Sequence, residues 1–141
     1  MTDLEPRRPV LLIVDDSIAH QRHYRIRIVT CEILQAHSFE EFFAVFADHK
    51  DRITHVIMDG NLPLATLKRR QNPEEVGWGK GTRLAAHARE AGFRGPIAAF
   101  STDPLEQAAL MACGCTLKIE KTADPSFSRQ AILDFLSTPV P

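Results

Sequence analysis

The strongest structural signal in the chain is PVLLIVDD, residues 9–16. It places five consecutive apolar residues, Val10–Val14, directly before Asp15 and Asp16. A short apolar run without alternation is typical of a strand buried on both faces of a parallel sheet. Because open parallel sheets bind ligands beyond the carboxyl ends of their strands, we expect the two aspartates to lie in a functional site.

Similar apolar runs recur along the chain, and a segment with helix signals follows each of them. The predicted strands are Pro9–Val14, Thr30–Gln35, Ile53–Met58, Pro96–Phe100 and Cys115–Ile119. The predicted helices begin near Ser17, Ser38, Thr82, Asp103 and Asp124, and the first is expected to end near Arg25. This alternation predicts an α/β fold, a parallel sheet of five strands with helices on both faces.

The predicted second helix has a clear start and a clear buried face. Ser38 and Glu41 have the spacing of a capping box. A row of phenylalanines then recurs at helical spacing, at Phe39, Phe42, Phe43 and Phe46. Such a row is typical of a helix face packed into the core, so we do not expect a ligand pocket there.

The composition is that of an ordinary globular protein. The 141 residues are expected to form one domain, 1–141, with its core at about 9–137. Seventeen Lys and Arg against eighteen Asp and Glu give a net charge of −1, which argues against a nucleic-acid or membrane-surface binder. Three cysteines, and no apolar run long enough for a membrane span or signal peptide, favour the cytoplasm.

Polar residues end the predicted strands. They are Asp15 and Asp16 after the first strand, Asp59 after the third, Ser101 after the fourth and Lys121 just beyond the fifth. Crowded carboxylates repel one another unless a cation intervenes, and Mg²⁺ takes carboxylate oxygens together with phosphate and water. A carboxylate at such a site can attack phosphorus, with an ammonium and a hydroxyl to hold the transferred group.

Four motifs, in this order, resemble those of bacterial response-regulator receiver domains. They are LLIVDDS at Leu11–Ser17, MDGNLP at Met58–Pro63, Ser101-Thr102, and the segment from Gly114 to Lys121. The resemblance spans nearly the whole chain. It implies the flavodoxin-like receiver fold, an α/β fold with a five-stranded parallel sheet of strand order 2-1-3-4-5.

The resemblance also implies where the phosphoryl group and the metal bind. Asp59 would accept a phosphoryl group from the phosphohistidine of a sensor histidine kinase or a histidine phosphotransfer protein. The implied Mg²⁺ ligands are Asp15, Asp16 and Asp59, with the main-chain carbonyl of Asn61. Ser101 would donate a hydrogen bond to the phosphoryl group.

The remaining implications concern Lys121 and the output. Lys121 would pair with the phosphoryl oxygen. The chain would be a phosphoacceptor that catalyses only its own phosphorylation and dephosphorylation, and not an enzyme in the ordinary sense. Since 141 residues leave no room for an output module, we expect the signal to leave through a downstream protein, onward phosphotransfer or a phosphorylation-dependent dimer.

The chain departs from the receiver pattern at several positions. Thr122 replaces the proline that usually follows the lysine, which puts the usual cis bond in doubt. Lys118 replaces the aromatic residue that normally swings inward on phosphorylation, so the usual switch is not expected to operate. Thr102 replaces a smaller residue and is expected to slow dephosphorylation. The first helix is predicted to be about one turn short.

The segment Gly60–Gly81 is also longer than a usual strand-to-helix connection. The extra residues are at about 64–80, and the most conspicuous are Lys68-Arg69-Arg70, Glu74-Glu75 and Trp78. Two interpretations stay open: an exposed loop whose charges balance, or a lid or docking surface beside Asp59. Tryptophan and arginine are common anchors of protein interfaces, which supports the second.

Two other functions compete with the phosphoacceptor. A phosphorylation-independent adaptor would keep the fold and use the insert and the face that carries Lys118. A phosphatase that turns over an aspartyl-phosphate would need a second acid two residues after Asp59. That position is Asn61, which argues against an enzyme.

Other residues that bind metals in some proteins have a simpler explanation here. Cys113 and Cys115 are expected to be buried, unreactive thiols, because two cysteines without further ligands are a weak metal signal. His20 and His23 share one face of the first helix and are expected to be exposed to solvent.

Overall fold

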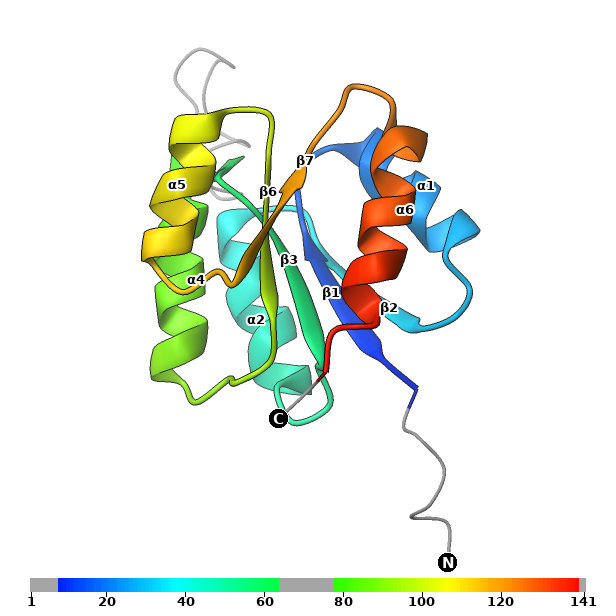
Figure 1. Ribbon diagram of the computed structural model, residues 1–141. Coiled ribbons are helices and arrows are strands. Elements are labelled where there is room, and N and C mark those ends of the chain that lie inside the picture. The colour runs from blue at the N-terminus through cyan, green and yellow to red at the C-terminus, as the bar shows by residue number, and fades with distance from the viewer. Residues whose placement is uncertain (1–7, 64–77, 140–141) are drawn as a thin grey trace, which may run out of the picture.

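The computed structural model describes residues 8–63 and 78–139 of the chain. Five parallel strands form the central sheet, with helices on both sides (Figure 1). They are β1 (Val10–Val14), β2 (Glu32–Ala36), β3 (His55–Asp59), β6 (Ile97–Ser101) and β7 (Leu117–Glu120). Their order, β2-β1-β3-β6-β7, is the predicted 2-1-3-4-5 when only these strands are counted, so the predicted fold class is confirmed.

Most predicted strand boundaries are displaced by one or two residues. The predicted third strand, Ile53–Met58, becomes His55–Asp59, because Ile53 donates its backbone N–H to the carbonyl of His49, 3.1 Å away at the end of the preceding helix. The other changes are Pro9–Val14 to Val10–Val14, Thr30–Gln35 to Glu32–Ala36, Pro96–Phe100 to Ile97–Ser101, and Cys115–Ile119 to Leu117–Glu120. As a result, Asp59 and Ser101 are the last residues of their strands.

The helices begin at residues that the sequence marks. They are α1 (Ile18–Arg27), α2 (Phe39–His49), α4 (Gly81–Glu90), α5 (Pro104–Ala112) and α6 (Pro125–Leu136). The side chains of Ser17, Ser38, Asp103 and Asp124 each accept a backbone N–H of the first turn. The first helix reaches Arg27 instead of the predicted Arg25. Within the described residues, no helix is both long and apolar enough to cross a membrane.

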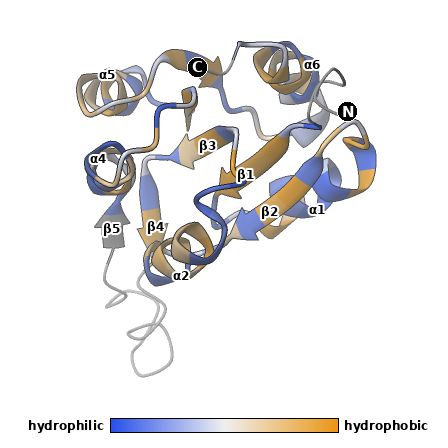
Figure 2. Cartoon of the chain, turned by 90° about the horizontal axis from the view of Figure 1, so that it is seen from below, coloured by the Kyte–Doolittle hydropathy of each residue, from blue (hydrophilic) through white to orange (hydrophobic). Residues whose placement is uncertain are grey.

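The sheet separates two hydrophobic layers. Leu11 and Ile13 of β1 pack on the side of α1 and α6, whereas Leu12 and Val14 pack on the side of α2, α4 and α5. These four side chains have no exposed surface. Figure 2 shows hydrophobic β1 between the helices, while much of α1 is hydrophilic. Burial of each such side chain contributes roughly 2 kcal/mol to folding, which makes β1 a rigid support for the residues that follow it.

Two further strands lie beyond β3. β4 (Asn61–Pro63) and β5 (Trp78–Lys80) pair antiparallel, with Asn61 opposite Lys80, in a short ladder that the sequence did not predict. Only residues 64–77 of the predicted insert lie between them, and this part, with the charged residues at 68–70 and 74–75, lies outside the described residues. The Gly81 N–H donates to the Gly60 carbonyl at 2.8 Å, which holds the start of α4 against the end of β3.

Candidate phosphoacceptor site

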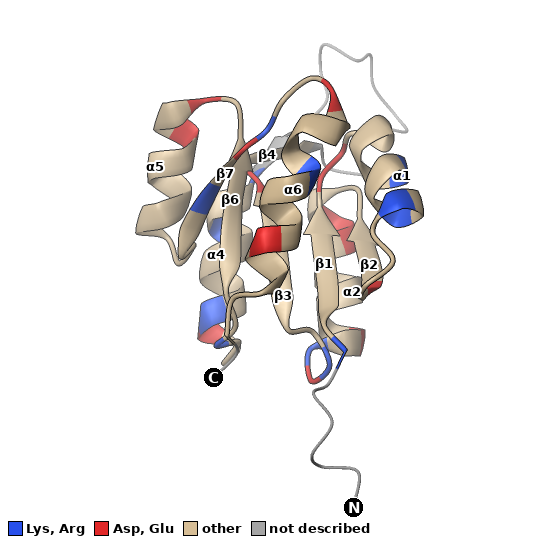
Figure 3. Ribbon diagram, turned by 45° about the vertical axis from the view of Figure 1, so that its right-hand side comes forward, with Lys and Arg blue, Asp and Glu red and all other residues tan. Residues whose placement is uncertain are grey.

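The predicted site residues lie at the carboxyl edge of the sheet, which we define as the edge where β1, β3, β6 and β7 end. Figure 3 shows acidic and basic segments meeting at this upper edge. Asp15, Asp16 and Asp59 form an acidic cluster here, in which one ligand atom from each residue lies within 4.8 Å of the others. Lys121 lies against the cluster, and Ser101 ends the neighbouring strand β6.

Asp59 is buried, with 7% of its surface exposed. Its Oδ1 accepts the backbone N–H of Gly60 at 2.7 Å. Burial, followed by the charge of Asp15, raises the pKa of Asp59 to about 7, against the opposing effect of Lys121. Asp16 adds to the rise and the Gly60 N–H opposes it. Without a bound metal ion, this carboxyl is therefore partly protonated near neutral pH.

Lys121 is the positive group of the site. Its Nζ lies 2.9 Å from Oδ1 and 2.8 Å from Oδ2 of Asp15, and 3.4 Å from Oδ2 of Asp59. Burial by itself lowers the pKa of Lys121, but the charges of Asp15 and Asp59 raise it above its usual value. Its backbone N–H donates to the Ser101 carbonyl at 3.1 Å, so β6 fixes its position.

The acidic cluster offers the oxygen donors that Mg²⁺ requires. Asp15 is fully buried, and its Oδ2 accepts no hydrogen bond of adequate geometry even though the Lys121 ammonium lies 2.8 Å away. The single Lys121 ammonium faces three carboxylates, and a divalent cation with carboxylate ligands would offset the negative charge that remains. Asp16 is partly exposed and completes the cluster on the solvent side. The residues present therefore fit a magnesium ion.

Ser101 is buried, and its hydroxyl already has a partner that the sequence did not indicate. Its Oγ donates to Oε1 of Glu106 at 2.7 Å and accepts the backbone N–H of Asp103 at 3.0 Å. Glu106 lies in the first turn of α5, where acidic residues are common because of the helix dipole alone. Its place in the sequence therefore gives no sign of its contact with Ser101.

Asn61 extends the same hydrogen-bond network to β4 and β5. Its Nδ2 donates to Oε2 of Glu106 at 3.0 Å, and its Oδ1 accepts from Lys80 Nζ at 2.8 Å. Asn61 and Lys80 are also cross-strand partners in the β4–β5 ladder. The network therefore runs from Ser101 through Glu106 and Asn61 to Lys80. The Asn61 main-chain carbonyl stays a predicted metal ligand.

Lys118 is exposed on β7. Because this residue is a lysine, position 118 has no aromatic ring that could move toward Ser101. Gln107 instead ties the ends of the two neighbouring strands, because its Nε2 donates to the carbonyls of Ser101 and Ile119, each at 3.1 Å. Thr102 is exposed, and its effect on dephosphorylation stays a prediction.

His20 contradicts the prediction of a solvent-exposed histidine. It is buried, with its Nδ1 2.7 Å from Ser17 Oγ and its Nε2 2.7 Å from the Thr122 carbonyl. The ring therefore connects the start of α1 to the loop after Lys121. Thr122 stands in this loop where receivers usually have a proline, and the described residues contain no cis peptide bond. His23 is partly buried and lies 3.2 Å from an Arg129 nitrogen.

The cysteines are free thiols of differing exposure. Cys115 is buried, and burial raises its pKa to about 12, which keeps the thiol protonated and unreactive. Cys113 is half-buried, so the prediction of burial is wrong for this residue. It is the C-cap of α5, where its backbone N–H donates to the Leu110 carbonyl.

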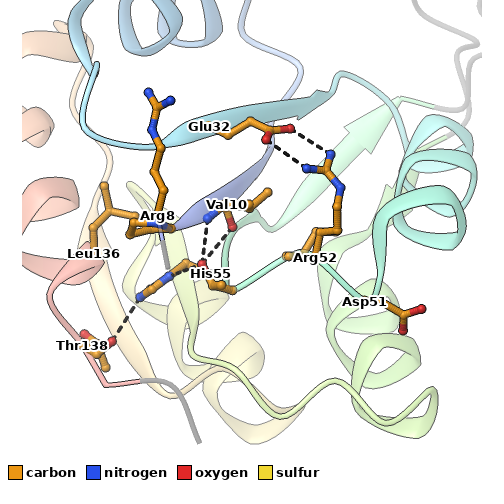
Figure 4. A pocket seen from close by; sticks show the side chains of 11 residues that line it. Arg8, Val10, Glu32, Asp51, Arg52, His55, Leu136 and Thr138 are labelled. Atoms are coloured by element: carbon orange, nitrogen blue, oxygen red, sulfur yellow. Dashed lines mark hydrogen bonds and ion pairs between the residues drawn. The ribbon is translucent and has the colours of Figure 1, made fainter. Parts of the chain in front are cut away.

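A separate cavity of about 790 Å³ lies at the opposite, amino-terminal edge of the sheet (Figure 4). Several of the polar groups drawn there pair with one another. Arg52 and Glu32 form two hydrogen bonds of 2.9 and 2.8 Å, and His55 Nε2 lies 3.1 Å from the Thr138 carbonyl. These contacts close the lower end of the sheet and are remote from Asp59.

The fold is that of response-regulator receiver domains, as the motifs implied. The structure is similar to that of the chemotaxis protein CheY4 from Vibrio cholerae, with a TM-score of 0.66 and 20% identity over 92% of this chain and 99% of that one. It is also similar to a putative response regulator from Chloroflexus aurantiacus, with a TM-score of 0.67 and 20% identity over 94% of this chain and 100% of that one.

A two-component response regulator of the LuxR family from Aurantimonas is similar too, with a TM-score of 0.68 and 19% identity over 93% of this chain and 86% of that one. No protein-family model and no curated protein match the sequence. At these identities the likeness establishes the fold alone.

Proposed function

We propose that this chain is a receiver that takes a phosphoryl group on Asp59 from the phosphohistidine of a histidine kinase or a histidine phosphotransfer protein. The observation that carries the proposal is the acidic cluster with its ammonium. Asp59 Oδ2 lies 3.4 Å from Lys121 Nζ, and one carboxylate oxygen of Asp59 lies within 4.8 Å of a carboxylate oxygen from each of Asp15 and Asp16. An ordinary structural ion pair does not need three carboxylates around one lysine.

The proposed transfer follows from the charges at the site. The deprotonated Asp59 oxygen attacks phosphorus, the new O–P bond forms as the histidine N–P bond breaks, and the imidazole nitrogen keeps the electron pair and takes a proton. Lys121 then holds the phosphoryl oxygen, and Ser101 donates its hydroxyl hydrogen. Asp15, Asp16 and Asp59 would hold a Mg²⁺ ion, which when bound would supply positive charge to the phosphoryl oxygens and favour the ionised form of Asp59.

A surface for the donor lies beside the acidic cluster. Ile18 is 76% exposed and begins α1 only two residues after Asp16, and Ile26 on the same helix is 55% exposed. A hollow of about 610 Å³ lies next to Ile18 and is also lined by Arg22. Exposed apolar side chains in a group mark protein contacts, and arginines at the border favour an acidic partner. We place the phosphohistidine donor here, with an apolar helix face and an acidic margin.

The output is a protein contact or onward phosphotransfer, and the chain acts in the cytoplasm with its donor. A phosphorylation-independent adaptor is the second candidate, because exposed Lys118 leaves the usual aromatic switch without its main part. The two candidates differ in one respect that can be measured. The adaptor binds its partner whether or not Asp59 carries a phosphoryl group.

The test is phosphorylation by acetyl phosphate, followed by intact-mass measurement. We expect wild-type protein to gain one phosphoryl group with Mg²⁺ and none with a chelator. Asp59→Asn should gain no phosphoryl group. The matched control is Asp48→Asn, which changes an exposed residue of α2 and should react as the wild type does. Equal modification of Asp59→Asn, or none of the wild type, contradicts the phosphoacceptor.

A further inference from the structure

We propose that Glu106 is a positioning residue that occupies the place of the phosphoryl oxygen at Ser101 and must leave it when Asp59 is phosphorylated. The proposal rests on the proposed function and adds a control element to it. Glu106 acts through Ser101 and through Asn61, and it connects the phosphoryl state of Asp59 to the β4–β5 ladder.

The first support is the hydrogen bonding of the Glu106 carboxylate. Oε1 accepts from Ser101 Oγ at 2.7 Å, and Oε2 accepts from Asn61 Nδ2 at 3.0 Å. A serine hydroxyl has a single hydrogen to donate. Ser101 cannot donate it to Glu106 and to a phosphoryl oxygen at the same time, so the two acceptors compete.

The second support is the position of the Glu106 side chain. It lies directly on the backbone of Gly60, the residue after Asp59, and a Cβ at Gly60 would overlap the Glu106 carboxyl group. An anionic carboxylate at this place opposes a phosphoryl group through like charge as well as by competition for the hydroxyl. A hollow of about 430 Å³, lined by Gly60, Asn61 and Lys80 as well as Glu106, gives the side chain space to move into.

The third support is the continuation of the network away from the site. Once Glu106 leaves, the Asn61 amide nitrogen loses its 3.0 Å partner, while Asn61 Oδ1 still accepts from Lys80 at 2.8 Å. Asn61 and Lys80 are cross-strand partners at the end of the β4–β5 ladder nearest Asp59. A rearrangement of this pair therefore changes the ladder from which the chain leaves for residues 64–77. This path does not need an aromatic residue at position 118.

The experiment compares wild type with Glu106→Ala, Glu106→Gln and the control Glu90→Ala, which changes an exposed glutamate at the end of α4. Beryllofluoride with Mg²⁺ serves as the phosphoryl mimic, and its affinity is measured at fixed Mg²⁺. We expect Glu106→Ala to bind it about tenfold more tightly, the size of one charge-assisted hydrogen bond. Glu106→Gln should fall between, since its amide oxygen can still accept from Ser101, and Glu90→Ala should match the wild type.

The second readout is backbone hydrogen exchange in the β4–β5 ladder, at residues 61–62 and 78–80. We expect beryllofluoride to change this exchange in wild type and in Glu90→Ala. In Glu106→Ala the exchange should already be altered without the mimic and should change little when it is added. If Glu106 had only a structural role, its replacement by alanine would not reproduce the change in hydrogen exchange that beryllofluoride causes in wild type.

The outcomes separate the two proposals. The role of Glu106 is refuted if wild type and Glu106→Ala bind beryllofluoride with the same affinity. It is also refuted if wild type binds beryllofluoride but hydrogen exchange in the β4–β5 ladder does not change. In both cases the phosphoacceptor proposal stands. If neither wild type nor folded Glu106→Gln binds beryllofluoride, the proposed function fails and the role of Glu106 fails with it.

Discussion

The raised pKa of Asp59 predicts that replacing this residue stabilises the protein, and that the gain depends on pH. Its pKa rises from 3.8 to about 7 on folding, mainly through burial. The folded state therefore holds the proton more tightly than the unfolded state. The stabilisation of the folded state by protonated Asp59 is complete below pH 3.8 and is lost as the pH rises through about 7. Ionised Asp59 therefore destabilises the metal-free protein at pH 8.

The size of the effect follows from the shift. At about 1.4 kcal/mol per pKa unit, the full rise from 3.8 to about 7 corresponds to roughly 4 kcal/mol, of which more than half is lost between pH 5 and pH 8. This pKa shift already includes the opposing charge of Lys121. We therefore expect Asp59→Asn to gain about 2 kcal/mol more over wild type at pH 8 than at pH 5.

Urea denaturation followed by circular dichroism, without divalent ions and at constant ionic strength, measures this difference. Subtracting wild type from Asp59→Asn at each pH removes the contributions of the histidines, which titrate in the same range. Asp48→Asn is the control and should show no such dependence. A difference between wild type and Asp59→Asn that is equal at pH 5 and pH 8, or a less stable Asp59→Asn at pH 8, refutes the reasoning.

Four further predictions follow from the same contacts. Lys121→Met leaves buried Asp15 without its ammonium and should lower the free energy of unfolding by about 3 kcal/mol, measured in urea; an unchanged value contradicts the ion pair. Gly81→Ala places a Cβ against the Asp59 carbonyl and should cost about 2–3 kcal/mol by thermal unfolding; a neutral result would show that α4 can shift. Mg²⁺ at pH 8 should raise the Tm of wild type by about 3–5 °C but not that of Asp15→Asn, and a similar rise in both excludes the acidic cluster as the site. Ile18→Ser should slow transfer from a protein donor by about tenfold and leave the reaction with acetyl phosphate unchanged; equal effects on both reactions would exclude a docking role.

The sheet and its reactive edge could be predicted because their signals are local. An apolar run such as Val10–Val14 is recognisable by itself, and the order of elements along the chain restricts the ways in which parallel strands can be arranged. Once the strands are assigned, parallel geometry brings the ends of β1 and β3 together, so Asp15 and Asp59 were expected to meet. The strand boundaries were less accurate, because hydrogen bonds such as that from Ile53 to His49 depend on how the neighbouring helix ends.

The contacts that surround the site could not be predicted in this way. Glu106 meets Asn61 across 45 positions of the sequence, and His20 meets the Thr122 carbonyl across 102. In the sequence, a glutamate in the first turn of a helix and a histidine on a short helix have ordinary explanations that involve no distant partner. The pairing of Asn61 with Lys80 was hidden for the same reason, since strands of three residues carry too little pattern to recognise.

By itself, therefore, the sequence determined the α/β fold and the acidic and basic groups at the carboxyl edge, because both follow from the type and spacing of neighbouring residues. The strand order was implied by the resemblance to receiver domains. Only the tertiary structure decided that the hydroxyl of Ser101 is engaged by Glu106 and that this contact continues to Lys80. The reason is that a hydrogen bond depends on distances of about 3 Å and on direction. Packing of the whole chain sets both, and no local pattern encodes them.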